Sequence, residues 1–216
     1  MHNTIKNLIY IEELIKSKAN HNELAKIIAV SKTFPIENVL PLIEYGHLHY
    51  GENKVQEALD KWTDMKNDNQ NIQLHLIGRL QTNKVKFALK IFDYIHSLDS
   101  EKLANKISDE QQKHKKKPKI FIQVNLGNEV QKSGIDKRNL NDFYKFCKTL
   151  NLDIIGTMCI PPNDGYTKKY FSEMSDLNKK LNFKELSMGM SEDYLEAIRY
   201  NATYIRVGSK IFGSRS

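Results

Sequence analysis

The chain has 216 residues, of which 40% are hydrophobic and 27% are charged, and its formal net charge is +7. This length and balance are typical of a globular protein with one sizeable core, and they exclude a disordered chain. No apolar stretch approaches the ~18 residues that a membrane span needs, and the first residues lack the pattern of a secretory signal. Cys147 and Cys159 have no metal-binding spacing and lie in apolar patterns, so we expect reduced core thiols in a cytoplasmic protein without membrane contact.

The positive charge raises the question of a nucleic-acid partner. Lysine is dense only in residues 113–119, where the run is broken by His114 and Pro118. Cations followed by a proline are a common helix stop signal, and no aromatic residues interleave the run as a base-stacking platform requires. We therefore interpret it as a solvated helix end and loop, and we expect no nucleic-acid partner.

Helices and strands are predicted to alternate along the chain. A first helix, beginning with Thr4 as its cap, has apolar residues at helical spacing, namely Ile5, Leu8, Ile11 and Ile15. Eight segments are predicted strands, at residues 27–32, 47–53, 72–78, 94–98, 119–125, 153–160, 185–190 and 204–208. Between them lie predicted helices, with apolar positions at Val39 and Ile43, at Val55, Leu59 and Trp62, in residues 84–91, at Leu103 and Ile107, at Leu140, Phe143, Cys147 and Leu150, and at Tyr170, Met174, Leu177 and Leu181.

Four connections carry further expectations. Asn53, with Gln56 three residues later, resembles a helix start. Ser100 is expected to help cap the helix after the fourth strand, and Ser191 to begin the seventh helix. Residues 126–135 are rich in glycine and asparagine and are predicted to form a loop at the ligand face.

Strands that alternate with helices are the pattern of an α/β (β/α)8 barrel of the TIM type. Eight residues follow Gly208, too few for a full eighth outer helix, so the extra N-terminal helix is expected to take that place. No composition shift marks a linker, and residues 1–216 are predicted to form a single barrel domain. A barrel without a swapped domain has no evident need to dimerise, so we expect a monomer.

Lys32 ends the apolar run of the first predicted strand. Barrels place their ligands at the carboxyl ends of the strands. A partly desolvated amine there has a lowered pKa, which makes it a candidate for Schiff-base chemistry. The alternative is a lysine that simply reaches water, which is the more frequent environment of this residue.

The last two strands are followed by candidate anion-binding turns. Ser191 follows the seventh strand, and the eighth is followed by Gly208 and Ser209, in the two places where barrels frequently bind phosphate. Glu192 and Asp193 count against an anion site, and Ser191 as a plain helix cap is the alternative. On an alternating strand Arg206 shares a face with Gly208 and is expected to point toward the barrel mouth.

Several segments together resemble a known family. They are Ala29-Val30-Ser31-Lys32-Thr33, Gly51-Glu52-Asn53 with Gln56-Glu57, His75-Leu76-Ile77-Gly78 with Leu80-Gln81 and Asn83-Lys84, Leu186-Ser187-Met188-Gly189-Met190-Ser191, and Arg206-Val207-Gly208 with Ile211-Phe212-Gly213. In order and spacing they are similar to the pyridoxal phosphate homeostasis protein family, also called YggS- or PROSC-like. Its members resemble the N-terminal barrel of alanine racemase and bind pyridoxal 5′-phosphate (PLP) through a lysine Schiff base.

The resemblance implies a role for six residues of this chain. Lys32 would form the Schiff base, Arg206 would face the pyridine nitrogen, and Asn53 would lie beside the ring. The phosphate would be held by Ser191, Gly208 and Ser209, with serine at the last position where the family often has threonine. The implied function is a non-catalytic PLP carrier that buffers the cofactor and hands it to apo-PLP enzymes.

A PLP-dependent amino-acid racemase acting through Lys32 is the alternative function. Arginine does not release its proton near neutral pH, so Arg206 would leave the pyridine nitrogen unprotonated, which disfavours transamination but permits racemisation. A two-base racemase also needs an acid–base group opposite the lysine, which alanine racemases take from a second domain. The sequence offers no such domain, and the carrier is therefore favoured.

Two further groups of residues leave alternatives open. Histidines gather on the second to fourth strands, at His47, His49, His75 and His96. Without Asp or Cys at ligand spacing, satisfied core or rim histidines are a better interpretation than a metal site. Lys132, in the loop after the fifth strand, either approaches the ligand mouth or is solvated.

Overall fold

Apolar strands and amphipathic helices alternate around a ring in the computed structural model, which describes residues 1–18, 24–127 and 133–213. The strands are β1 Lys26–Val30, β2 His49–Glu52, β3 Gln73–Leu76, β4 Tyr94–Leu98, β5 Lys119–Asn125, β6 Ile135–Asp136, β7 Asp153–Met158, β8 Glu185–Met190 and β9 Tyr204–Val207. The α-helices are α1 Asn3–Lys18, α2 Leu40–Glu44, α3 Val55–Asp68, α4 Val85–Ile91, α5 Glu101–His114, α6 Leu140–Thr149, α7 Thr167–Lys180, α8 Tyr194–Arg199 and α9 Ser209–Phe212.

Parallel pairing closes eight of these strands into a barrel. Neighbours follow the order β4-β3-β2-β1-β9-β8-β7-β5, and β4 pairs with β5 to complete the ring. The predicted (β/α)8 barrel is therefore confirmed. The two-residue strand β6 lies outside the ring and extends β5, where the sequence predicted only loop. Two residues are too few to produce a recognisable strand pattern.

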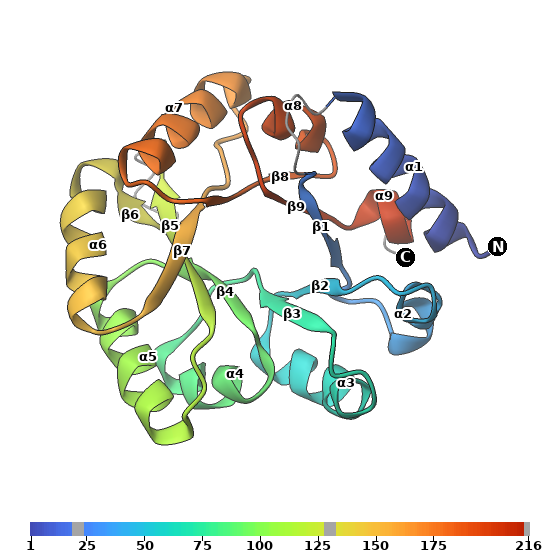
Figure 1. Ribbon diagram of the computed structural model, residues 1–216, viewed down its shortest axis with the longest axis horizontal. Coiled ribbons are helices and arrows are strands. Elements are labelled where there is room, and N and C mark those ends of the chain that lie inside the picture. Colours follow the sequence, from blue (N-terminus) through green and yellow to red (C-terminus); the bar gives the residue numbers. More distant parts are fainter. Residues whose placement is uncertain (19–23, 128–132, 214–216) are drawn as a thin grey trace.

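Helix α1 fills the gap in the outer ring, as predicted, because α9 has only four residues. It packs between α8 and α2 and also contacts α9 (Figure 1). Its apolar stripe buries Leu8, Ile11 and Ile15. The predicted cap was wrong, since the helix begins at Asn3 and Thr4 donates its N–H to Nδ1 of His2 at 3.3 Å.

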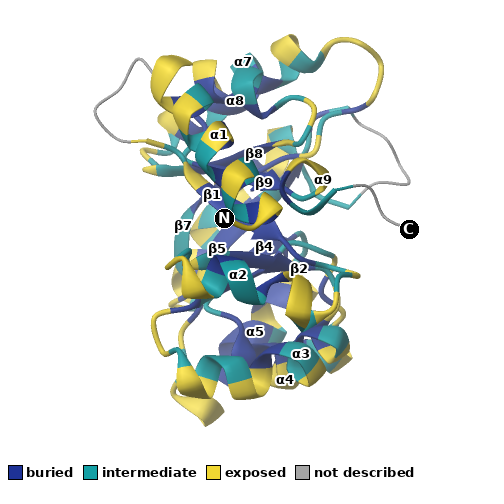
Figure 2. Ribbon diagram, turned by 90° about the vertical axis from the view of Figure 1, so that its right-hand side faces the viewer, coloured by how far each residue is buried: buried dark blue, intermediate teal, exposed yellow. Residues whose placement is uncertain are grey.

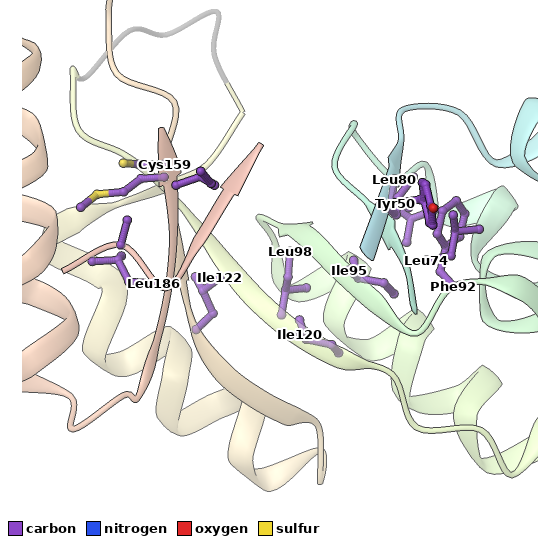
Figure 3. Close-up of a cluster of buried hydrophobic side chains, with 14 of the residues drawn as sticks. Tyr50, Leu74, Leu80, Phe92, Ile95, Leu98, Ile120, Ile122, Cys159 and Leu186 are labelled. Carbon is purple, nitrogen blue, oxygen red and sulfur yellow. The ribbon is translucent and has the colours of Figure 1, made fainter. Parts of the chain in front are cut away.

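The buried side chains form two clusters. The larger lies between the strands and the surrounding helices, and Figure 3 shows part of it, from Tyr50 and Leu74 at one end to Cys159 and Leu186 at the other. The smaller, which includes Ile28, lies inside the barrel. Exposed residues gather on the outer faces of the helices, while the strands are mostly buried (Figure 2).

Both cysteines are buried and free, as predicted. Burial raises the pKa of each thiol to about 12, so neither is a reactive thiolate near neutral pH. No helix of the described residues is long and apolar enough to cross a membrane.

Several local boundaries differ from the predictions. Helix α3 begins at Val55, two residues after Asn53. Helix α8 begins at Tyr194, because Asp193 accepts the N–H of Met190 at 2.6 Å and holds a turn before the helix. The buried face of α7 is displaced from the predicted one and comprises Phe171, Met174, Ser175 and Asn178.

Two predicted helix ends are confirmed. Ser100 is the N-cap of α5, and its hydroxyl accepts the N–H of Leu103 at 3.4 Å. The lysine run follows the other end of α5, where Lys115 has a left-handed φ of 52°. The run is therefore a helix end and loop.

The strand histidines bond to one another or to backbone. Nε2 of His47 lies 2.9 Å from the carbonyl oxygen of His49. Nδ1 of His49 lies 3.0 Å from Nε2 of His75, whose Nδ1 lies 2.9 Å from Nε2 of His96. No group of three or more potential metal ligands occurs among the described residues. These contacts match the interpretation as satisfied core histidines.

Burial keeps these rings neutral. It lowers the pKa of His47 to about 4, and burial together with the nearby His47 lowers the pKa of His49 to about 4. Burial also lowers the pKa of His75 and His96 well below the ordinary value of 6.5. In the unfolded chain all four imidazoles take up protons near pH 6.5.

Stability is therefore expected to fall as the pH drops from about 6.5 toward 4, where the unfolded chain binds more protons than the folded one. Each such histidine contributes up to about 1.4 kcal/mol per pH unit in this window. His47→Gln keeps a side-chain N–H for the His49 carbonyl but does not titrate, so its stability should decline less steeply. The check is urea unfolding between pH 7.5 and 4.5, with His114→Gln at the exposed end of α5 as the control. Equal slopes for wild type and both variants contradict the expectation.

Candidate functional site

A cavity of about 940 Å³ opens at the carboxyl ends of the strands. Its lining comes from residues that follow several strands, including Lys32 after β1, Asn53 after β2, Gly78 after β3 and Ser191 after β8. This is the end of a parallel barrel at which ligands bind. The cavity is within the size range of small-molecule and cofactor sites, roughly 300–1,000 Å³.

All six residues singled out from the sequence line this one cavity. They are Lys32, Asn53, Ser191, Arg206, Gly208 and Ser209. The structure thus brings them together from four separate stretches of the chain, while their individual roles stay predictions.

Lys32 occupies a tight turn rather than the end of the strand. Strand β1 ends at Val30, and the N–H of Phe34 donates to the carbonyl of Ser31 at 3.1 Å. Thr33, the third residue of the turn, has a φ of 69°. A β-branched residue in this left-handed region is strained by on the order of 1–3 kcal/mol. Strained residues of this kind cluster at functional sites and need support from their surroundings.

The support comes from Lys61 on α3, which we call the Lys61 clamp. Its Nζ donates to the carbonyls of Ser31 and Phe34, at 2.8 and 2.9 Å, and so holds both ends of the turn. The same ammonium lies 2.6 Å from Oε1 of Glu52, which is fully buried. Oε1 also accepts from the Ser31 hydroxyl at 2.8 Å and from Nε1 of Trp62 at 3.0 Å.

This clamp was not predicted from the sequence. Alternation along β2 offered a signal, since Gly51 faces the barrel interior and Glu52 must then face α3. A buried glutamate requires a cation and hydrogen-bond donors. The partner among the lysines of α3 depends on how the helix sits on the sheet, which the pattern does not specify.

The two candidate anion turns are joined directly. The N–H of Gly208 donates to Oγ of Ser191 at 3.2 Å. The serine oxygen thereby accepts from the neighbouring turn, and its hydroxyl proton is available for an acceptor in the cavity. Glu192 and Asp193 also line the cavity, but the Asp193 carboxylate accepts the N–H of Met190 and belongs to the turn itself.

Gly189 permits this arrangement. The register between β8 and β9 shifts between Ser187 and Met190, and Gly189 has a φ of 90°. A Cβ there would lie 2.6 Å from the Cβ of Ala197. The glycine therefore allows both the bulge and the close approach of α8 that set the position of Ser191.

Arg206 reaches the cavity from inside the barrel and is only 5% exposed. Its NH1 donates to Oγ of Ser187 at 2.7 Å, and its NH2 donates to the carbonyl of Cys159 at 2.9 Å. Burial lowers the pKa of Arg206, and Cys159 and Asp193 oppose that effect. A guanidinium still stays protonated and donates hydrogen bonds only.

A polar wall also lines this cavity and was not predicted. It carries Arg79 after β3, Gln123 and Asn125 on β5, Ser133 before β6 and Asn163 after β7. Nε2 of Gln123 donates to the carbonyl of Ser133 at 3.1 Å. Ser133 bears out the expectation that its loop lies at the ligand face, whereas Lys132 lies outside the described residues. Polar residues at alternate positions of an apolar strand, as on β5, were the available signal.

The cavity therefore combines an amine, a pair of joined turns with hydroxyl donors, and a buried guanidinium. These groups fit a small molecule that bears a carbonyl and an anionic group. Nothing in this combination requires a metal ion.

Comparisons with known proteins agree with this geometry. The family model described as alanine racemase, N-terminal domain, matches residues 11–216. The pyridoxal phosphate homeostasis protein of Aquifex aeolicus is 35% identical over 215 residues, which cover 95% of this chain and 93% of that protein. The protein of the same name from Vibrio cholerae is 36% identical over 201 residues, with 88% and 85% covered.

Solved structures give the same result. PipY of Synechococcus elongatus with PLP bound has a TM-score of 0.86 and 32% identity, over 97% of this chain and 100% of that one. Alanine racemase of Bartonella henselae, with a TM-score of 0.72, 17% identity and 99% and 61% coverage, shares the fold alone. The proteins from Aquifex aeolicus and Vibrio cholerae match nearly the whole chain, and this chain therefore belongs to the pyridoxal phosphate homeostasis protein family.

Proposed function

We propose that this protein binds PLP as a Schiff base on Lys32 and serves intracellular PLP homeostasis as a carrier that hands the cofactor to apo-enzymes. The observation that carries the proposal is the convergence of Lys32, Arg206 and the joined Ser191–Gly208 turns on one cavity. The family supports it, since its relatives are named for PLP homeostasis and a PipY structure contains PLP.

The residues present fit each part of the cofactor. Ser191, Gly208 and Ser209 offer hydroxyl and amide donors to the phosphate, and Arg206 offers N–H donors to the ring nitrogen. Asn53 would lie beside the ring. Lys32 would supply the amine that holds the aldehyde as a Schiff base. When bound, PLP supplies an electron sink to amines that join it.

The cavity lining favours a carrier over a racemase. Among its described residues the ionisable side chains are Lys32, Arg79, Glu192, Asp193 and Arg206. Both carboxylates belong to the turn after β8, which we assign to the phosphate. A second acid–base group on the opposite side of the ring is required for two-base racemisation. None of the described lining residues fills that role.

The wider setting follows from the same proposal. We assign residues 1–216 to a single PLP-binding domain, acting as a monomer in the cytoplasm. The free, buried cysteines agree with a reducing compartment. Partners are PLP and apo-PLP enzymes, which the carrier serves without chemistry of its own.

Borohydride reduction of the PLP-loaded protein is expected to fix the cofactor on Lys32. Reduction converts the imine to a stable secondary amine, and peptide mapping by mass spectrometry locates it. Lys32→Ala should lose the visible absorption of the bound cofactor. An adduct found mainly on Lys132 or Lys210 contradicts the assignment.

Removing a phosphate donor should weaken PLP binding selectively. Ser191→Ala and Ser209→Ala each delete a hydrogen bond to a charged group, worth about 1.5–3 kcal/mol. Pyridoxal lacks the phosphate, so its affinity should change little in either variant. Fluorescence titration measures both ligands, and Ser133→Ala on the polar wall of the cavity is the matched control. Equal affinity of the wild type for pyridoxal and PLP speaks against a phosphate site.

Removing the Lys61 clamp should slow Schiff-base formation at Lys32, although no residue assigned to cofactor binding other than the turn around Lys32 is affected. Lys61→Met alone leaves Glu52 as a buried unpaired charge, which costs about 3–5 kcal/mol of stability. Combining it with Glu52→Gln removes both charges, so this double variant is the one to load with PLP. We expect about tenfold slower Schiff-base formation, since the strained turn loses two charged hydrogen bonds.

The visible absorption band followed after mixing with PLP gives that rate. Lys54→Met is the control, because Lys54 is exposed and its ion pair with Glu57 at 2.6 Å is a surface contact. A folded double variant that reacts at the wild-type rate shows that the turn does not need the clamp.

A further inference from the structure

An unbroken series of hydrogen bonds crosses the inside of the barrel and ends at Arg206. Nδ1 of His49 meets Nε2 of His75 at 3.0 Å, and Nδ1 of His75 meets Nε2 of His96 at 2.9 Å. Nδ1 of His96 lies 2.9 Å from Oγ of Ser187, to which NH1 of Arg206 donates at 2.7 Å. We call this series the histidine relay. It links β2, β3, β4, β8 and β9.

Arg206 sets the direction of the whole relay. A guanidinium only donates, so Oγ of Ser187 accepts from it. The other hydrogen-bond partner of that oxygen among the described residues is Nδ1 of His96, which then receives the serine proton. His96 carries its own proton on Nε2 and donates to His75, which does the same toward His49. Each ring is thereby held as the neutral Nε2–H tautomer.

The reverse direction leaves a buried donor without an acceptor. If Nδ1 of His96 donated, Ser187 would accept twice, and its proton would have no partner among the described residues. Ser187 is completely buried, and an unsatisfied buried donor is costly. Burial also lowers the pKa of both His75 and His96, which agrees with neutral rings.

Aromatic contacts fix the rings within this series. His75 stacks on Tyr94 with ring centroids 4.1 Å apart, and His96 stacks on Phe121 at 4.3 Å. Ser187 therefore donates its hydrogen bond to an imidazole with little freedom to rotate. Together with the carbonyl of Cys159, it holds two of the five N–H donors of Arg206.

We propose that Ser187 and His96 are positioning residues for Arg206, and that the histidine relay orients the remaining guanidinium donors toward the ring nitrogen of PLP. The inference rests on the proposed function, because it deepens the role given to Arg206 there. Neither Ser187 nor His96 lines the cavity, so their effect passes through the arginine. Removing either side chain should therefore lower the binding affinity only of ligands that have the ring nitrogen.

Two ligands and two serine variants test this. The ligands are PLP and its 1-deaza analogue, in which a C–H group replaces the ring nitrogen. Ser187→Ala interrupts the relay, and Ser97→Ala is the matched control, since Ser97 is a buried serine on β4 whose hydroxyl has no partner among the described residues. Dissociation constants are measured for all combinations by absorption titration.

Ser187→Ala is expected to weaken PLP at least tenfold and to leave the affinity for the analogue within about twofold, while Ser97→Ala changes neither. Equal weakening of both ligands means that Ser187 serves the fold in general, and no weakening means that Arg206 is held without it. Either result overturns the inference. A wild type that binds neither ligand overturns the proposed function itself.

A second measurement needs no variant and no ligand. Nitrogen-15 NMR of histidine-labelled wild-type protein at neutral pH distinguishes the two neutral imidazole tautomers. The inference requires Nε2–H for His49, His75 and His96. Nδ1–H at His96 reverses the relay and overturns the proposal, even if Ser187→Ala does not fold.

Discussion

The pairing of β1 with β2 on one side and β9 on the other is the constraint on which the site depends. Strand β1 is the seam where the first and last strands of the ring meet, and its register sets Ile28 beside Arg206 and Val30 beside Gly51. The turn after β1 then opens beside the turn after β9. The positions of both turns therefore depend on the closure of the ring.

Two polar systems work from opposite sides of this seam. The Lys61 clamp acts from outside the ring, where a buried ammonium holds the strained turn that carries Lys32. The histidine relay acts from inside, where barrels usually pack branched apolar side chains. Buried polar groups are costly unless fully bonded, and here they fix the two side chains that would meet the aldehyde and the ring. The two joined anion turns rely on backbone geometry, with Gly189 allowing Ser191 to reach Gly208.

Periodicity and strand-end logic were enough to predict the barrel and to place Lys32, Ser191, Arg206, Gly208 and Ser209 near its mouth, whereas Asn53 was assigned to the site from the family resemblance. Three strand predictions coincide with β4, β5 and β8, because their apolar runs are bounded by turn residues. Contacts that depend on which faces meet across the ring were not predictable from the sequence. The hydrogen bonds of Lys61 to Ser31 and of His96 to Ser187 are of this kind, since each joins residues that are far apart in sequence. The two-residue β6 and the turn before α8 were missed because short hydrogen-bonded pieces leave no periodic signal.

The central claim is that Lys32 holds PLP for delivery and not for turnover. The most direct measurement mixes the PLP-loaded protein with an apo-form of a PLP-dependent enzyme and follows the recovery of that enzyme's activity. Amino acids in heavy water, with the carrier alone, serve as the parallel sample. We predict that the acceptor recovers its activity while the carrier loses its bound cofactor, with no appreciable α-hydrogen exchange in the parallel sample. Rapid exchange with inversion by the protein alone, without transfer to the acceptor, contradicts the account and makes the barrel a racemase.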